Sequence, residues 1–518
     1  MKILKSFVWM LAMTAAIAVS SCGGSDSAGG KVERFVSDNV DIVLTGDVHR
    51  FIEATGSTVE NGAVKPSSAL EDIISTLGGR ASDKIDEFLS FKGIDWSNGM
   101  LAMKMKGDQP DAIFVWGVTD EKEFAKAYMD QVDADLDMRD QDGYITVGDD
   151  KAAIVLKDKM GMFVIKGGEP LKASRAISAI ESWEQAAKEN PLAGWKAEKL
   201  AAEHIVNVLV NAKFIKKFME NESYELRALR AQFPDAEKSL KKLMNSVMTG
   251  YFDIEGKTAS AEINIYDQDG NDLKVYEGGK INTDLLKYGN SDDVFVAAVG
   301  DTKTMVDLIK KNLPEMPAEQ QQMFSTLIGN LQGSAVFMAG PTSSDINSWD
   351  DVSGWNFTAA VSYKDNASAG KALDMLADVA AMEDLRVGGH NAGKALVVKT
   401  VKKDYSDATF NYDTYEYEGI REIEIPFYLK VDGKNLVVCN ANVQGKGSPV
   451  KAELLKDGIS AMAFDCRKGG KLLGAINSPF GAQGNVVGTA SSVKATITLT
   501  DTEDNFLEAI IKLIGSNL

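Results

Sequence analysis

The chain has 518 residues, of which 44% are hydrophobic, 25% are charged and 8% are aromatic, a composition that excludes a disordered or fibrous protein. Its net charge of -19 repels nucleic acid and anionic lipid head groups, so we expect no nucleic-acid partner. Only three His and three Cys are present, so we predict no metal site, no cofactor and no disulfide framework.

The N-terminal segment predicts export and lipid attachment. Lys2 and Lys5 precede an apolar run at 7–19, and small residues then lead to Cys22. As a helix this run would span about 20 Å, short of the roughly 30 Å hydrocarbon core, so a permanent transmembrane helix is the weaker interpretation. We therefore predict a lipoprotein signal peptide at residues 1–21 and acylation of Cys22. The alternative is an ordinary cleaved signal that leaves a free thiol.

Residues 22–30 form the next segment, which we predict to be a flexible tether. After Cys22 it contains only Gly, Ser, Asp and Ala, a composition typical of flexible linkers. The folded body then lies close to a membrane of the cell envelope and contacts it through the lipid. We expect the outer membrane, and either its periplasmic or its surface face is compatible with the sequence.

Four apolar, β-rich runs end in Asp or Asn and pass directly into a helical pattern. They are residues 41–47, 204–211, 293–301 and 459–465. Asp or Asn at a helix N-cap accepts hydrogen bonds from backbone N–H groups, so each run predicts a strand-to-helix junction. The distance from Asp47 to Asp301 equals that from Asn211 to Asp465, 254 residues in each case. This equality predicts an internal duplication.

The remaining periodic segments predict both helices and strands. Helical spacing of apolar residues occurs at 121–134, 171–189, 239–247, 302–312, 318–328, 367–382 and 503–514. Strand patterns occur at 101–105, 113–118, 258–265, 357–362, 423–429 and 493–499, with hairpins at 154–164 and 427–437. Turns at 140–143 and 267–270 predict antiparallel pairing.

These elements predict an α+β fold of two tandem duplicated halves, each with antiparallel sheets and helices packed on one face. The first half spans 31–280 and contains a long module and a short module. The second half spans 290–518 and carries an inserted loop at 342–356.

The layout resembles a family of uncharacterised lipoproteins of the Bacteroides group that share a domain of unknown function. The matching features are the small residues at 19–21 before Cys22, the opening strand at 40–46 and the repeated strand-to-helix junctions. The resemblance implies an envelope-anchored protein and transfers no catalytic residue.

Motifs for catalysis are absent from the sequence. It contains no phosphate-binding glycine loop of the Walker or dinucleotide type and no Gly-x-Ser-x-Gly nucleophile elbow. We interpret His49, in a first helical turn, and His204, at a strand start, as structural; His390 is expected in a flexible loop. Asp133, with the alternating acids that follow it, lacks the glycine and closing glutamate of an EF-hand.

One segment, 404–425, interleaves aromatic rings with acids and is the candidate ligand surface. Flat apolar rings beside carboxylates suit a sugar or a cationic peptide, whereas ordinary cross-strand aromatic pairing is the competing interpretation. Two tryptophans of the inserted loop at 342–356 could join this candidate surface. The candidate residues are Tyr405, Phe410, Tyr412, Tyr415, Tyr417, Trp349 and Trp355.

Two cysteines remain after lipidation. Cys439 lies in an apolar run and is expected to be a buried thiol, and Cys466 follows a strand end. The sequence leaves a disulfide between them open.

The leading functional hypothesis is a noncatalytic, lipid-anchored envelope protein whose surface binds a glycan or another envelope protein. The alternative is a secreted hydrolase that uses paired carboxylates on polysaccharide or peptidoglycan, because such a pair is spatial and cannot be recognised in a sequence.

Overall fold

The structure is a computed structural model of the chain. It describes residues 28–515 except 61–62, 69, 72–73, 75–91, 108, 133–135, 142, 221–235, 291–293, 304–305, 307–321, 323–324, 326, 342–354, 383–384, 405–407, 413, 441–446, 467–470, 473–475 and 478–479. The predicted signal peptide, Cys22 and most of the tether lie outside the described residues. No helix of the described residues is long and apolar enough to cross a membrane.

The chain divides into two compact units. Unit 1 comprises residues 1–275 and 491–518, and unit 2 comprises residues 276–490. The segment 491–518, which the sequence analysis assigned to the second half, therefore groups with unit 1.

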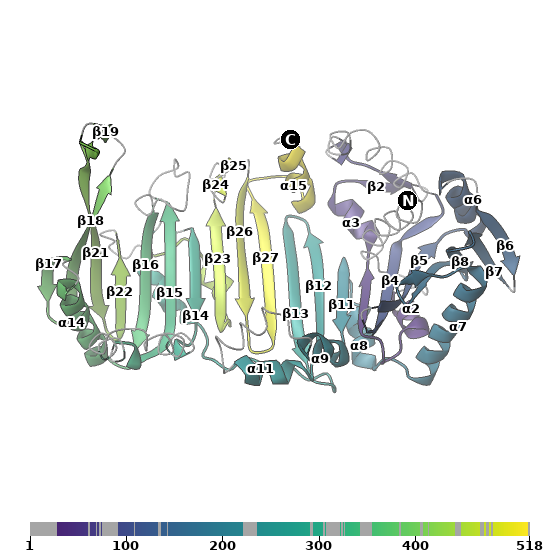
Figure 1. Ribbon diagram of the computed structural model, residues 1–518, viewed down its shortest axis with the longest axis horizontal. Helices are drawn as coiled ribbons and strands as arrows, with labels where there is room; N and C mark the ends of the chain where they lie inside the picture. Colours follow the sequence, from purple (N-terminus) through teal and green to yellow (C-terminus); the bar gives the residue numbers. More distant parts are fainter. Residues whose placement is uncertain are drawn as a thin grey trace. The chain divides into compact units, whose positions relative to one another are not determined.

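Unit 1 contains a sheet in which every pairing is antiparallel. Its strands follow the spatial order β6, β7, β8, β9, β5, β4, β1, β11, β12, β13 and β27. Their bounds are β1 Ile42–Gly46, β4 Ile94–Lys106, β5 Gln109–Val118, β6 Asp137–Gln141, β7 Tyr144–Gly148, β8 Ala153–Lys157, β9 Met160–Lys166, β11 Val206–Val210, β12 Val247–Glu255, β13 Thr258–Tyr266 and β27 Ser492–Thr500. The short strand β10 (Glu169–Pro170) pairs with β9, and β2 (Thr58–Glu60) pairs with β3 (Ala63–Lys65). The strands are drawn in Figure 1.

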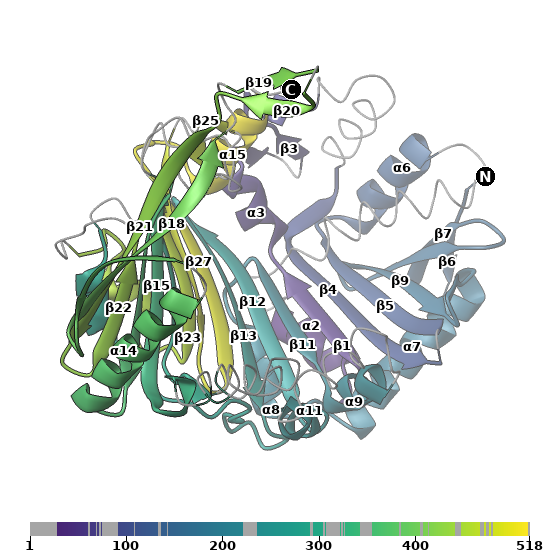
Figure 2. The same cartoon turned by 60° about the vertical axis from the view of Figure 1, so that its left-hand side comes forward.

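Helices cover both faces of the sheet in unit 1, whereas the sequence analysis predicted one covered face. Adjacent residues of a strand point to opposite faces, and on β8 Val155 joins one core while Ile154 joins another. Ile180 of α7 (Ala173–Glu189) packs in the first core and Phe124 of α6 (Glu121–Val132) in the second. Figure 2 shows α6 and α7 on opposite sides of these strands. The prediction failed because strands such as β8 are apolar at successive positions and have no polar face.

The other helices of unit 1 are short. Among the described residues they are α2 (Ala28–Phe35), α3 (Val48–Ala54), α8 (Gly194–Leu200), α9 (Ala212–Glu220), α11 (Ala236–Leu243) and α15 (Phe506–Gly515). The predicted helix at 239–247 ends at Leu243, and β12 begins at Val247. β6 pairs with β7 as far as Gln141 and Tyr144, which is the antiparallel pairing predicted for this segment. The turn at 267–270 instead follows β13 and leads to an isolated bridge between Tyr266 and Asp272.

Unit 2 is also built on an antiparallel sheet. Its strands follow the order β26, β23, β14, β15, β16, β22, β21, β18 and β17. Their bounds are β14 Phe295–Val299, β15 Leu331–Pro341, β16 Trp355–Tyr363, β17 Arg386–Asn391, β18 Ala395–Asp404, β21 Arg421–Asp432, β22 Asn435–Cys439, β23 Ser460–Cys466 and β26 Gly481–Gly488. Two small hairpins, β19–β20 (Thr409–Asn411 and Glu416–Glu418) and β24–β25 (Lys471–Leu472 and Ile476–Asn477), complete the described strands.

Two cores pack against this second sheet. One contains Leu285 of the 3-10 helix η1 (Thr283–Tyr288) and Leu455 of the 3-10 helix η4 (Ala452–Leu455). The other contains Leu373 of α14 (Asn366–Met382). Both units therefore combine helices with antiparallel sheets, which confirms the predicted α+β class.

Candidate functional site

The predicted aromatic surface corresponds largely to the hairpin β19–β20, which is inserted between β18 and β21. Its strands pair Phe410 with Tyr417, and it projects beyond the ends of β18 and β21 (Figures 1 and 2). The Phe410 ring lies edge-on to Tyr412, Tyr415 and Tyr417, with centroid separations of 5.1, 6.4 and 5.0 Å. These spacings are within the range of favourable aromatic pairs. One phenylalanine thus holds three tyrosines in a single cluster.

The three tyrosines are open to solvent. Tyr412, Tyr415 and Tyr417 retain 79%, 80% and 51% of their accessible surface, whereas most aromatic side chains are largely buried in folded proteins. The acidic side chains of Glu416 and Glu418 are exposed on the same hairpin. Isolated hairpins of this size are marginal in water, so the ring contacts with Phe410 are expected to hold the tip together.

The structure does not bring all of the predicted ligand-surface residues together. Tyr405 and Trp349 lie outside the described residues. Trp355 begins β16 and is half-buried, and its carbonyl oxygen accepts a 2.7 Å hydrogen bond from the Asn440 side chain. The candidate surface therefore consists of Phe410 and the three tyrosines around it.

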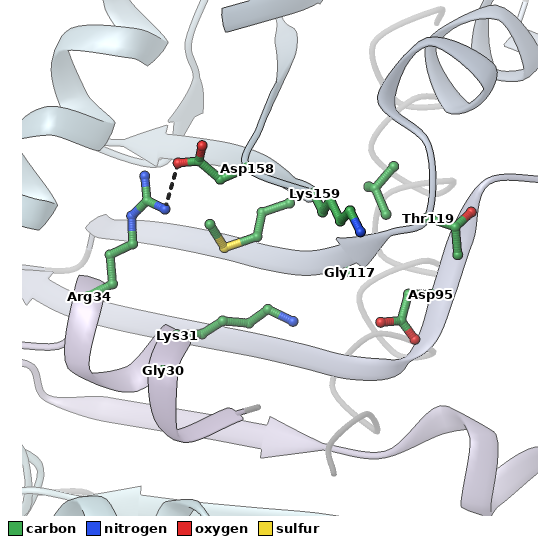
Figure 3. Close-up of a pocket in the computed structure, with 10 residues that line it drawn as sticks. Gly30, Lys31, Arg34, Asp95, Gly117, Thr119, Asp158 and Lys159 are labelled. Carbon is green, nitrogen blue, oxygen red and sulfur yellow. Dashed lines mark hydrogen bonds and ion pairs between the residues drawn. The ribbon is translucent and has the colours of Figure 1, made fainter. Parts of the chain in front are cut away.

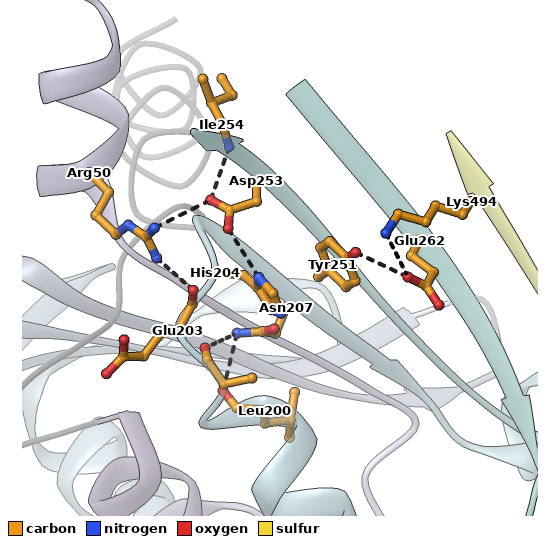
Figure 4. Close-up of polar contacts among 11 residues, drawn as sticks. Arg50, Leu200, Glu203, His204, Asn207, Tyr251, Asp253, Ile254, Glu262 and Lys494 are labelled. Atoms are coloured by element: carbon orange, nitrogen blue, oxygen red, sulfur yellow. Dashed lines mark hydrogen bonds and ion pairs between the residues drawn. The ribbon is translucent and has the colours of Figure 1, made fainter. Parts of the chain in front are cut away.

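A polar network that no sequence motif indicates lies in unit 1 (Figure 4). Asp253 of β12 is 3.2 Å from His204 Nδ1 and 3.7 Å from Arg50 of α3, and it accepts the backbone N–H of Ile254. The His204 ring stacks on Tyr251, with ring centroids 4.0 Å apart. Arg50 also donates to the Glu203 carbonyl at 2.6 Å. The network therefore connects α3, the approach to β11, and β12.

Tyr251 is unsuited to act as a nucleophile or base in this network. Burial, followed by its 3.0 Å hydrogen bond to Glu262, raises the pKa of Tyr251 to about 12. The phenol therefore remains protonated at neutral pH. The sequence contains little indication of this network, because its residues other than His204 are of common types and come from separate segments of the chain.

The other two histidines also contact carboxylates. His49 lies 3.7 Å from Glu53 in α3, as its predicted place in a first helical turn allows. His390 belongs to β17, and its Nε2 is 2.8 Å from Asp374. The expectation of a flexible loop at His390 was wrong, because β18 pairs along the Gly-rich segment in spite of its glycines.

Cys439 and Cys466 are both free thiols. Cys439 is buried as predicted, and its thiol donates to the Tyr428 carbonyl at 3.6 Å. Among the residues that the structure describes, no group of three or more His, Cys, Asp or Glu could hold a metal ion.

Comparisons with known proteins add little. No protein family matches the sequence. No curated protein matches it either. Crystal form IV of TP0453 is similar to part of the chain with a TM-score of 0.28 at 7% identity, covering 45% of this chain and 79% of that chain. Crystal form III of TP0453 gives a TM-score of 0.27 at 8% identity over 47% of this chain and 80% of that chain. Similarities this low carry no argument about fold or function.

Proposed function

We propose that this protein is a lipid-anchored envelope protein that binds a glycan, without catalysis, through the tyrosine cluster of β19–β20. The observation that carries the proposal is the exposure of three tyrosines around Phe410 at the end of a projecting hairpin. Exposed aromatic groups of this kind mark interaction surfaces more often than isolated exposed residues do.

The chemistry of the tip suits a neutral or amino-bearing sugar. A tyrosine ring offers a flat apolar face to the C–H face of a pyranose, and its hydroxyl group remains available for hydrogen bonds. Glu416 and Glu418 add carboxylates that accept hydrogen bonds from sugar hydroxyl or ammonium groups. An anionic polysaccharide is disfavoured by these carboxylates and by the net charge of -19.

Glycan-array binding by the purified protein tests this proposal. Tyr412→Ala combined with Tyr415→Ala should lower binding at least tenfold, because two stacking faces are removed. Tyr276→Ala is the matched control, since this tyrosine of unit 2 is 50% exposed outside the hairpin. Binding that survives the double substitution would refute the assigned surface. Binding of an envelope protein but of no glycan would refute the glycan as the ligand. Release of shortened glycan products would contradict the proposal that the protein is not a catalyst.

The lipid anchor is the second part of the proposal. It rests on the basic start, the apolar run and the small residues before Cys22. Cys22→Ala should move the protein from the outer-membrane fraction to the soluble fraction, and Cys439→Ala should not. Retention of the Cys22 variant in membranes would exclude the lipid as the anchor.

We also infer that the two halves arose by duplication. The order from β6 to β12 in unit 1 corresponds strand for strand to the order from β17 to β26 in unit 2. Equivalent backbone bonds support the match: Asn211 donates to Asp41 at 2.9 Å, and Asp465 donates to Val294 at 2.8 Å. Asn211 and Asp465 are one of the two pairs whose equal spacing predicted the repeat.

The helix that follows the fifth strand in each order is capped in the same way. The Asp120 carboxylate accepts the N–H of Glu123 at 2.8 Å before α6, and Asp365 accepts that of Ser368 at 2.7 Å before α14. A solved structure of each unit, superposed by these strands, tests the inference. A different strand order in either unit would overturn it.

A further inference from the structure

A pocket of about 950 Å³ lies on unit 1 beside the first half of α7. Its walls come from the turn between β7 and β8, from the end of β9 with β10, and from the solvent side of α7. Its volume is at the upper end of the range of small-molecule sites. The aromatic hairpin belongs to unit 2, so this pocket is separate from the proposed glycan surface.

α7 contributes a small and polar wall to the pocket. Ala176 and Ile180 are buried on its inner side, in the core of unit 1. Ser174, Ser178 and Ser182 recur every fourth residue on the outer side and line the pocket. The hydroxyl groups of Ser178 and Ser182 donate to helix carbonyl groups at 3.3 and 2.7 Å. These short side chains leave the charged groups around them to select the ligand.

The charged lining of the pocket is mostly positive. Its four cations and two acids are Lys151, Lys166, Lys172, Arg175, Asp150 and Glu169. Among the residues that the structure describes, the side chains of Lys151, Lys172 and Arg175 have no ion-pair partner. Lys166 acts electrostatically on Asp111, but that carboxylate already pairs with another lysine at 2.6 Å. The pocket therefore has an excess of positive charge in a chain whose net charge is -19.

The backbone around the pocket is held in place by hydrogen bonds. Asp149 Oδ1 accepts the backbone N–H groups of Lys151 and of the next residue, both at 2.8 Å. Leu171 accepts the N–H of Ala153 at 3.0 Å and donates its own N–H to Val164 at 3.2 Å, so it joins β8 and β9 to the start of α7. The cations are therefore carried by ordered backbone, which lowers the cost of arranging them around a ligand.

The start of α7 adds to the positive charge of the pocket. The N-cap residue Lys172 makes no side-chain hydrogen bond to the first turn of this 17-residue helix. N–H groups of a first helical turn carry partial positive charge and favour a nearby anion. This helix end reinforces the charges of Lys172 and Arg175 and does not form a site by itself.

A second pocket of unit 1, drawn in Figure 3, shows the contrast. Its arginine, Arg34, lies 2.9 Å from Asp158 and 2.5 Å from Glu184. Two carboxylates therefore already neutralise the guanidinium group. No comparable carboxylate holds Arg175 among the residues that the structure describes.

The exposure of the cations indicates what kind of anion fits. All four are exposed, so water and salt weaken each ionic contact, and a ligand with one charge gains little. A ligand that meets several cations at once needs two or more negative charges, which phosphate groups provide. Because charges more than about 10 Å apart are largely screened at 0.1 M salt, distant acidic residues do not cancel this local excess.

We propose that this pocket binds a phosphate-bearing ligand with at least two negative charges, either a free diphosphate or the phosphate head group of a lipid. Lys151, Lys172 and Arg175 contact the phosphate oxygens. Glu169 opposes the ligand's charge and limits its affinity. This site does not depend on the glycan surface in unit 2, so either proposal can fail alone.

Isothermal titration of the full-length protein with inorganic pyrophosphate and with monomeric dihexanoyl phosphatidic acid tests the site. We expect one molecule bound per chain, and the tighter of the two probes identifies the source as a free phosphate or a lipid head group. Acetate, with one charge, and zwitterionic dihexanoyl phosphatidylcholine should each bind about tenfold more weakly. Binding of the phosphate probes should weaken as the ionic strength is raised.

Three variants locate the binding. Lys172→Gln combined with Arg175→Gln should lower the affinity about tenfold. Lys126→Gln combined with Lys188→Gln is the matched control, because it removes the same charge from exposed positions of unit 1 outside the pocket and should bind normally. Glu169→Gln should raise the affinity. The proposal is overturned if neither phosphate probe binds, if the Lys172 and Arg175 double variant binds like the unaltered protein, or if the control pair loses as much affinity.

Discussion

The N-cap of α3 offers the sharpest test of the electrostatics of this fold. Asp47 accepts the N–H of Arg50 at 2.9 Å, yet its residue is only 4% exposed. Burial outweighs the backbone hydrogen bond and the nearby His49 and Arg50 charges, and it raises the pKa of Asp47 from 3.8 to about 6. The folded protein therefore prefers a protonated carboxyl at this position.

The sign of the effect follows from linkage. Because the folded pKa exceeds the unfolded value, the stability that this group contributes is complete below about pH 4 and is lost as the pH rises through 6. The difference between the two pKa values corresponds to about 3 kcal/mol at pH 7. Asp47→Asn keeps an oxygen for the Arg50 N–H and removes the charge. We expect it to raise the free energy of unfolding by about 2 kcal/mol at pH 7, with no gain at pH 4.

Urea unfolding at several pH values, followed by tryptophan fluorescence, measures this change. Four tryptophans in the described part of unit 1 report on its unfolding: Trp96, Trp116, Trp183 and Trp195. Asp365→Asn, followed by circular dichroism, is the matched control. The backbone hydrogen bond from Ser368 lowers the pKa of Asp365, so removal of its negative charge should destabilise the protein at pH 7. If Asp47→Asn is destabilised at pH 7, or gains equally at pH 4, burial is not the dominant effect.

Three further predictions concern packing, a buried ion and a thiol. A Cβ at Gly161 would lie 2.1 Å from the indole of Trp116 on the neighbouring strand, so Gly161→Ala should lower the free energy of unfolding in urea by about 1–3 kcal/mol. Gly194→Ala is the control, because its Cβ would meet nothing within 4 Å and the stability should change little. Lys196→Met removes the buried ammonium group that lies 2.7 Å from the Asp38 carboxylate, and it should lower the free energy of unfolding by about 2 kcal/mol in the same assay. Adding Asp38→Asn should restore part of this loss. If the losses from the two substitutions simply add, the two side chains are not coupled. Burial raises the pKa of the Cys466 thiol, so iodoacetamide should alkylate it more slowly than free cysteine at pH 8; equal rates would refute its burial.

Local features of the fold were accessible from the sequence. The side chain at Asp47 does cap a helix after a strand, and α14 matches the predicted span 367–382 closely. Both depend on residues near in sequence: a capping carboxylate acts within one turn, and helical periodicity repeats every few positions. The same holds for the antiparallel pairing of β6 with β7, which are neighbours in the sequence.

Long-range features were not accessible. The position of β1 between β4 and β11 depends on contacts between distant segments, and no local pattern encodes them. The aromatic hairpin was recognisable from its residues, but the exposure of Tyr415 depends on where β18 and β21 end.

The pairing of β27 with β13 gives the two ends of the chain an unequal role in folding. Seven residue pairs, from Thr258 with Thr498 to Asn264 with Ser492, join these strands within unit 1. During synthesis the N-terminal part emerges first, so one edge of β13 presents unpaired N–H and C=O groups until residues 491–500 have been made. Nascent unit 1 therefore has an open sheet edge that is closed only when β27 has been synthesised. A chain truncated before Ser491 would keep that edge exposed and be prone to aggregate.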